Sequence, residues 1–186
     1  MFGMKADRFT GRKILVAGAL SAFGPPLIHG LIRSGAEVLA TDRPSASLGT
    51  MRAWLDGAVQ VHATDENDPV LWVHSNHINL AGLILADPRD GAANAALARR
   101  VLPVLARNPD PFLAALCLDD VPFAPAQLSG VGLTRGHLTA APSPADTAPL
   151  AGRFLDAVRA GRAEVRLGAP RFPILAQVRP LTSRTC

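Results

Sequence analysis

The sequence predicts a single α/β domain, built as a doubly wound parallel sheet with helices on both of its faces. Short apolar segments alternate with longer segments of helical periodicity, which is the pattern of strands that pair in parallel. The length of 186 residues suits one domain, and no internal repeat or low-complexity linker divides it. We therefore expect one domain over residues 1–168, followed by a tail at 169–186 that contains proline and arginine.

The first half of the chain shows the clearest alternation. Lys13–Ala17 is a short apolar run typical of a buried parallel strand, and small residues follow it. Pro25 and Pro26 suit the first turn of a helix, where a missing N–H costs nothing, and Gly35 ends that helix. The same signals predict strands at 37–42, 59–62 and 80–86 and helices at 25–34, 47–55 and 68–74.

The second half continues the alternation with one interruption. Residues 92–107 carry apolar side chains at helical spacing, and Pro103 is expected to kink this helix. Further signals predict strands at 112–118, 131–134 and 163–167 and a helix at 145–160. Only the 12 residues from Asp119 to Gly130 join the strand at 112–118 to the next strand. That connection is too short for a long helix with its loops.

Composition excludes several classes of protein. With 48% hydrophobic and 18% charged residues, the chain is too apolar to be disordered. No run of about 18 residues lacks both a charge and a helix breaker, so no membrane span is expected. Cys117 and Cys186 form no disulfide or metal framework, and we expect a cytoplasmic protein. The chain contains no tyrosine, which excludes any mechanism that needs a phenol.

The positive charge is concentrated near the C-terminus. The chain carries a net charge of +4, but residues 150–186 contain seven arginines and two acidic residues, a net +5. This pattern fits either an arginine-rich face for an acidic partner or an ordinary solvated helix face, and we favour the second interpretation. Few aromatic residues lie among these arginines, so the region gives no specific nucleic-acid signal.

The loop after the first strand carries the sharpest functional signal. Gly18 and Gly24 bracket small residues and Phe23, and such a loop lets the backbone approach a phosphate. Asp42 closes the second strand, where a carboxylate can accept both ribose hydroxyls of NAD and repels the 2′-phosphate of NADP. The adjacent Arg43 could instead pair with that phosphate, and we favour NAD. The expected cofactor-binding residues are Gly18, Ser21, Ala22, Phe23, Gly24, Asp42, Arg43 and Asp65.

These motifs resemble those of the short-chain dehydrogenase/reductase family. Gly18–Gly24 is similar to the family's Gly-x-x-x-Gly-x-Gly loop, with Ala22 in place of the middle glycine. Asp42 matches the position of its NAD-selecting acid and Asp65 that of its adenine-contacting aspartate. Residues 136–139 resemble the family's Pro-Gly-x-x-Thr loop, which follows the sixth strand near the nicotinamide. The resemblance implies a Rossmann-like fold and an NAD(P)-dependent oxidoreductase ancestry.

The family's catalytic residues have no counterpart here. The family places a serine at the end of the fifth strand and a Tyr-x-x-x-Lys motif on the next helix, and tyrosine moves the proton. Here the strand ends in Cys117 and Leu118, the connection is short and no tyrosine exists. We therefore expect a truncated member without the catalytic helix, a pseudoenzyme. Without that helix, residues 92–107 are expected to be exposed along Leu97, Val101 and Leu105, unless the tail or a partner covers them.

Weaker catalytic candidates leave other interpretations open. Asp119, Asp120 and His137 follow strand ends, and Asn94 is similar in place to the family's helical asparagine. No metal site is expected, because His74 and His77 have no further ligand nearby. Three hypotheses result: a silent nucleotide sensor or scaffold that pairs with itself or with another protein, an NAD-dependent oxidoreductase that uses His137 as acid, and a basic protein-interaction module.

Overall fold

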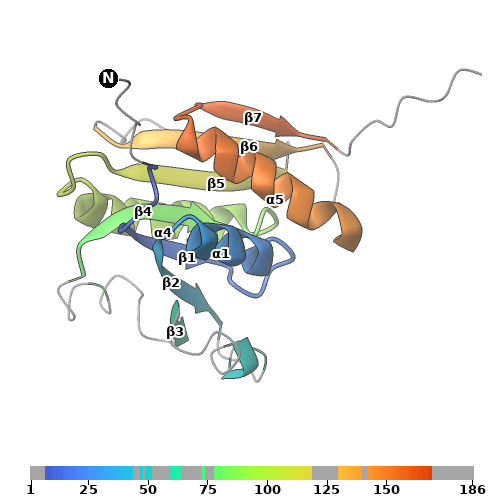
Figure 1. Cartoon of the computed structure of the whole chain (residues 1–186), viewed down its shortest axis with the longest axis horizontal. Helices are drawn as coiled ribbons and strands as arrows, with labels where there is room; N and C mark the ends of the chain where they lie inside the picture. The colour runs from blue at the N-terminus through green and yellow to red at the C-terminus, as the bar shows by residue number, and fades with distance from the viewer. Residues whose placement is uncertain are drawn as a thin grey trace, which may run out of the picture.

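A seven-stranded parallel sheet forms the centre of the chain (Figure 1). The computed structural model describes residues 7–43, 47, 49–51, 59–63, 73, 78–118, 130–139 and 142–168. The strand order is β3-β2-β1-β4-β5-β6-β7, and every neighbouring pair is parallel. This confirms the predicted doubly wound α/β fold. The strands are β1 (Lys13–Ala17), β2 (Glu37–Asp42), β3 (Val59–Ala63), β4 (Leu80–Leu85), β5 (Phe112–Leu118), β6 (Gly132–Leu138) and β7 (Glu164–Leu167).

Helices cover both faces of the sheet, as a parallel sheet requires. Helices α1 (Gly24–Arg33) and α5 (Pro144–Arg159) pack together on one face, and α4 (Gly91–Leu105) lies on the other. Leu27, Leu31 and Phe154 belong to the core under α1 and α5, whereas Val101 and Leu105 belong to the core under α4. The sheet separates the two cores, because successive side chains of each strand point to opposite faces.

The connection through α5 has an unusual hand. The β1-α1-β2 and β4-α4-β5 connections run toward opposite edges of the sheet, and their helices lie on opposite faces. Because both the direction and the face are reversed, the two connections have the same hand. The β6-α5-β7 connection moves in the same direction as β4-α4-β5 but lies on the face of α1. It therefore has the opposite hand to the other two, although parallel connections are almost always right-handed.

The expected exposure of the helix at 92–107 is wrong for two of its three residues. Val101 is 1% exposed and Leu105 is 0% exposed, because α4 packs over β4 and β5. Leu97 is partly buried. The sheet under α4 supplies the apolar surface that this helix face needs, including Leu83 and Leu113.

The side of β6 and β7 that faces away from α5 is polar. Gly136 and Leu138 point toward α5, so the side chains between and before them point to the other side. There Arg135 donates to Glu164, with 2.8 Å between Nη2 and Oε1. Among the described residues no helix lies over this surface, which we call the polar strip. It consists of Arg135, His137, Glu164 and Arg166.

Some predicted elements lie outside the described residues. Residues 49–51 are helical, within the helix expected at 47–55, but most of that segment and of the helix expected at 68–74 is not described. The connection at 119–129 and the tail after Gly168 are also outside the described part, so the expected loss of the catalytic helix stays a prediction.

Two arginines and two phenylalanines close the sheet at the amino ends of its strands. The Phe112 ring is 1% exposed and lies over the backbone of Gly82 on the neighbouring strand. The guanidinium carbons of Arg8 and Arg12 lie 5.2 and 5.8 Å from the centre of this ring. The Phe9 ring, 5.9 Å away, completes the cluster. Stacked cations and rings stabilise each other beyond their apolar contact.

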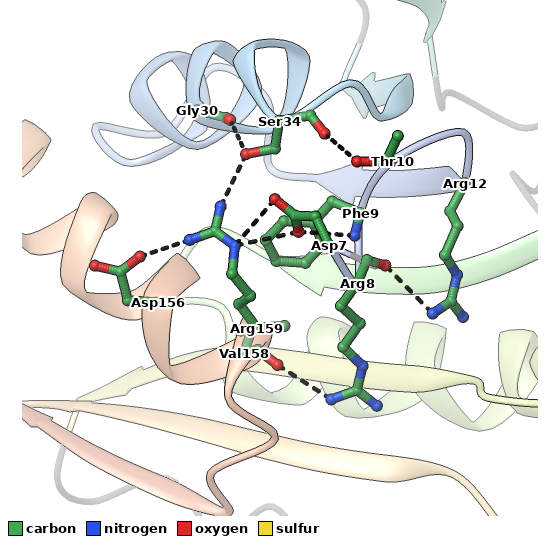
Figure 2. A network of polar contacts seen from close by, with 10 residues as sticks. All are labelled: Asp7, Arg8, Phe9, Thr10, Arg12, Gly30, Ser34, Asp156, Val158 and Arg159. Carbon is green, nitrogen blue, oxygen red and sulfur yellow. Dashed lines mark hydrogen bonds and ion pairs between the residues drawn. The ribbon is translucent and has the colours of Figure 1, made fainter. Parts of the chain in front are cut away.

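Arg159 at the end of α5 is the centre of a polar network (Figure 2). Its guanidinium donates to both carboxylate oxygens of Asp7, to Asp156 and to the Ser34 hydroxyl. Its charged carbon lies 5.1 Å from the centre of the Phe9 ring. The N-terminal segment is thereby attached to α1 and α5. This arginine serves the fold, which weakens the interpretation of the C-terminal arginines as a free binding face.

Candidate functional site

A pocket of about 470 Å³ lies at the carboxyl ends of β1, β2 and β4. In the strand order, β1 lies between β2 and β4. From β1 the chain continues to β2 and β3 on one side, and it then returns to form β4 on the other side of β1. Open parallel sheets bind ligands at such a reversal, because the diverging loops leave a crevice there. Of the expected cofactor-binding residues, Gly18, Ser21, Asp42 and Arg43 line the pocket.

The floor of the pocket is the loop after β1. Gly18 has φ +78°, which a side chain rarely tolerates, and a Cβ there would lie 3.0 Å from the backbone nitrogen of Asp87. The amides of Gly18 and Ala19 both donate to the carbonyl of Thr41 at the end of β2. The loop is therefore held between the ends of β2 and β4, and its glycine is needed for this close approach.

Asp42 holds this loop and also faces the pocket. Its carboxylate accepts the N–H of Leu20 through Oδ2 and that of Arg43 through Oδ1, both at 2.7 Å. Each carboxylate oxygen has two acceptor sites, so one site on each remains for a ligand hydroxyl. The Arg43 side chain donates to Asp90 at 3.1 Å, on the far side of the pocket.

Three charged residues that follow β4 complete the pocket, and they were not among the predicted site residues. Asp87, Arg89 and Asp90 all line it, and Arg89 pairs with Asp87 at 3.2 Å. Asn94, expected as a weak catalytic candidate, also lines it and donates its amide to the carbonyl of Asp87 at 2.7 Å. Their position in the sequence could have identified them, because charged residues directly after a parallel strand lie at the ligand-binding edge of the sheet.

The start of α1 does not open into this pocket. Ala22, Phe23 and Gly24 were expected to bind cofactor, yet none of them lines it. Phe23 is 1% exposed. A Cβ on Gly24 would lie 2.1 Å from the carbonyl oxygen of Ala19, so this glycine permits the loop to fold back on the helix. Ala22 instead lines a smaller pocket of about 310 Å³ with Pro26, Pro142 and Pro144.

Of the candidates not yet placed, only His137 lies among the described residues, and it lies away from the pocket. Asp65, Asp119 and Asp120 lie outside the described residues. His137 lies within β6, which continues to Leu138 instead of ending at 134, so residues 136–138 belong to a strand and not to the expected loop. Three strand spacings, about 14 Å, separate β6 from β1. His137 lines a different, open hollow of about 680 Å³ on the polar strip, with Thr139 at its end.

Cys117 is buried in β5. Burial raises the pKa of the Cys117 thiol above its usual 9.0, although the charge of Arg135 opposes the shift. A raised pKa means that the folded state binds this proton more tightly than the unfolded state does. The unfolding free energy should therefore fall as the pH rises past about 9.

We expect Cys117→Ala to remove this part of the pH dependence. Urea unfolding of both proteins between pH 7 and 10.5 measures it, and Cys186 is present in both. The unfolding free energy of the unmodified protein should fall relative to the variant above pH 9. Parallel curves would show that the thiol does not contribute.

The described residues contain no group of three or more histidine, cysteine or acidic side chains that could hold a metal ion. Among the helices of this same part of the chain, none is long and apolar enough to cross a membrane.

Solved structures of short-chain dehydrogenases share this fold. A citronellol catabolism dehydrogenase from Pseudomonas aeruginosa superposes with a TM-score of 0.66 at 15% identity, over 89% of this chain and 97% of that one. A short-chain type dehydrogenase/reductase from Mycobacterium ulcerans gives 0.61 at 18% identity, over 87% and 90%. An oxidoreductase of the same family from Burkholderia thailandensis gives 0.61 at 17%, over 85% and 91%.

No family model matches the sequence, and no curated protein matches it either. The structural likeness therefore establishes the fold, a short-chain-dehydrogenase-like Rossmann domain, at low sequence identity.

Proposed function

We propose that this chain binds a ribose-containing ligand of the NAD type at the pocket between β1, β2 and β4 but does not transfer hydride. It would act as a nucleotide sensor or as a scaffold subunit. The proposal rests on one combination: Asp42 faces a formed pocket, and the chain contains no tyrosine. The pocket supports ligand binding, whereas the tyrosine that usually donates the proton is missing.

The position of Asp42 supports NAD over NADP. Its carboxylate is fixed by two backbone amides and keeps one free acceptor site on each oxygen for the ribose hydroxyls. A 2′-phosphate would meet this negative charge. In the structure the guanidinium of Arg43 pairs with Asp90, and the comparison of NAD with NADP tests whether Arg43 offsets this charge.

The two alternative functions have less support. An oxidoreductase that uses His137 needs this side chain beside the nicotinamide end of the cofactor, but His137 lies within β6 and lines the separate hollow on the polar strip. A basic interaction module needs free arginines, but Arg159 is bound within the fold and Arg153 donates to the carbonyls of Arg166 and Gly168. A scaffold role would add a second copy or another protein as partner. The cytoplasmic location stays a prediction from cysteine usage.

Calorimetry and absorbance on the purified chain test this proposal. NAD should bind more tightly than NADP, and Asp42→Ala should weaken NAD binding about tenfold to hundredfold, because hydrogen bonds to a charged acceptor contribute roughly 1.5–3 kcal/mol. Asp156→Ala is the matched control, since this carboxylate is on α5, outside the pocket. Neither cofactor should give a steady change at 340 nm with a panel of carbonyl substrates.

Three results would contradict the proposal. Tighter binding of NADP would reverse the role of Asp42. Turnover that His137→Ala abolishes would favour the active oxidoreductase. The absence of binding by adenosine and by every adenine nucleotide would remove the ligand role altogether.

A further inference from the structure

We infer that the pocket takes a ribonucleoside without a 5′-phosphate, and that the pyrophosphate of a dinucleotide adds nothing to binding. This inference rests on the proposed function, because it concerns the ligand of the same pocket. It follows from a count of the donors and charges that a phosphate would need.

None of the first four N–H groups of α1, on residues 23–26, is available. The first four N–H groups of a helix lack partners within it, and in this fold they are the groups that hold a phosphate. Here the Phe23 residue is 1% exposed, and Pro25 and Pro26 have no N–H. Gly24 donates its N–H to the carbonyl of Ser21 at 3.0 Å and lies 3.1 Å from the Ser21 hydroxyl. All four positions are therefore buried, missing or occupied.

The hydroxyl of Ser21 is also occupied. It donates to the carbonyl of Ala86 at 3.0 Å and accepts the N–H of Gly24, and the side chain is buried. A hydroxyl has one hydrogen to donate, so none is left for a phosphate oxygen. Ser21 is the last residue of the loop that lines the pocket. Beyond it, the start of α1 faces the smaller pocket among Pro26, Pro142 and Pro144.

The charges of the pocket also disfavour a phosphate. Its charged side chains are three aspartates and two arginines, so the pocket carries a net charge of −1. Each arginine is paired with an aspartate, Arg43 with Asp90 and Arg89 with Asp87. Both arginines are largely exposed, at 81% and 72%, and such exposed pairs contribute little. The arginines could therefore turn toward a phosphate, and the test below includes them.

A nucleoside needs none of the missing groups. Its ribose hydroxyls can use the free acceptor sites of Asp42, and Asn94 adds a polar side chain on the opposite wall. The pocket volume of about 470 Å³ falls within the usual range of small-molecule sites, roughly 300–1,000 Å³. In this fold the 5′ end of the ribose points to the start of the first helix, which here is apolar.

The test compares adenosine, AMP, ADP and NAD by calorimetry on the full chain. We expect the affinities for AMP, ADP and NAD to equal that for adenosine within about threefold or to be weaker, and inorganic pyrophosphate not to compete with adenosine. Arg43→Gln combined with Arg89→Gln should leave the ratio of ADP to adenosine affinity unchanged. If ADP or NAD binds at least tenfold more tightly than adenosine, the inference is wrong while the proposed function stands. If none of the four binds, the proposed function fails as well.

Discussion

Phe112→Ala is expected to lower the free energy of unfolding by about 3–5 kcal/mol, which is typical for the loss of a fully buried aromatic ring. The ring fills the space above Gly82, contacts the ring of Phe9 and lies beside the guanidinium groups of Arg8 and Arg12. Removing it leaves a cavity and takes the aromatic face from two cations. Urea unfolding measures the effect, and the slope with denaturant should not change.

A substitution at Gly82 is a more specific control for the Phe112 ring than the truncation of a second buried side chain. A Cβ on Gly82 would lie 2.2 Å from the Phe112 ring, so Gly82→Ala should destabilise the unmodified protein. In the Phe112→Ala background the same methyl group enters the cavity and should recover part of the loss. The sign of the Gly82→Ala effect should therefore reverse between the two backgrounds. The same sign in both would show that the ring does not occupy this space.

Gly24→Ala is expected to be the second most damaging change, with a loss of about 1–3 kcal/mol or more. The new Cβ would lie 2.1 Å from the oxygen and 2.4 Å from the carbon of the Ala19 carbonyl. These are backbone atoms of the loop that forms the floor of the pocket, so the loop itself must move. We expect ligand affinity measured by calorimetry to fall together with the unfolding temperature.

Gly152→Ala is the matched control for this change. Gly152 lies exposed within α5, and a Cβ there would meet no atom within 4 Å. Because glycine is unfavourable inside a helix, alanine should stabilise the protein by about 0.5–1 kcal/mol. The two glycine substitutions should thus have opposite signs. A loss at Gly152, or no loss at Gly24, would contradict the packing described for these helices.

Local sequence patterns predicted most of the fold. The strand at 112–118 matches β5, and the helix start at Pro25 differs from that of α1 by one residue. The sixth strand was predicted too short because Gly136 and His137 are weak strand formers. Its length comes from partners: Cys117 and Leu118 on β5 pair with His137 and Leu138. Such pairing is a tertiary effect that a local pattern does not contain.

The site was only partly predictable. Asp42 was predicted because a carboxylate at the end of the second strand has a known chemical role in this kind of fold, and it lines the candidate pocket. Asp87 and Asp90 were missed because their importance depends on β4 lying beside β1, which follows from the strand order. The occupation of the Gly24 amide by Ser21 could not be predicted, since it depends on how the loop folds back on itself.

The network around Arg159 has a consequence for the order in which the domain folds. The hydrogen bond from Arg8 to the carbonyl of Val158 joins residues 150 positions apart, and the bond from Arg159 to Asp7 joins residues 152 positions apart. During synthesis the N-terminal segment therefore cannot form these contacts until the ribosome has produced α5. Contacts between such distant residues form slowly, because a long loop must close first. Until then the Phe9 ring lacks the guanidinium of Arg159 and the α1 face of the sheet lacks its second helix, so the nascent chain presents an incomplete core to chaperones and proteases.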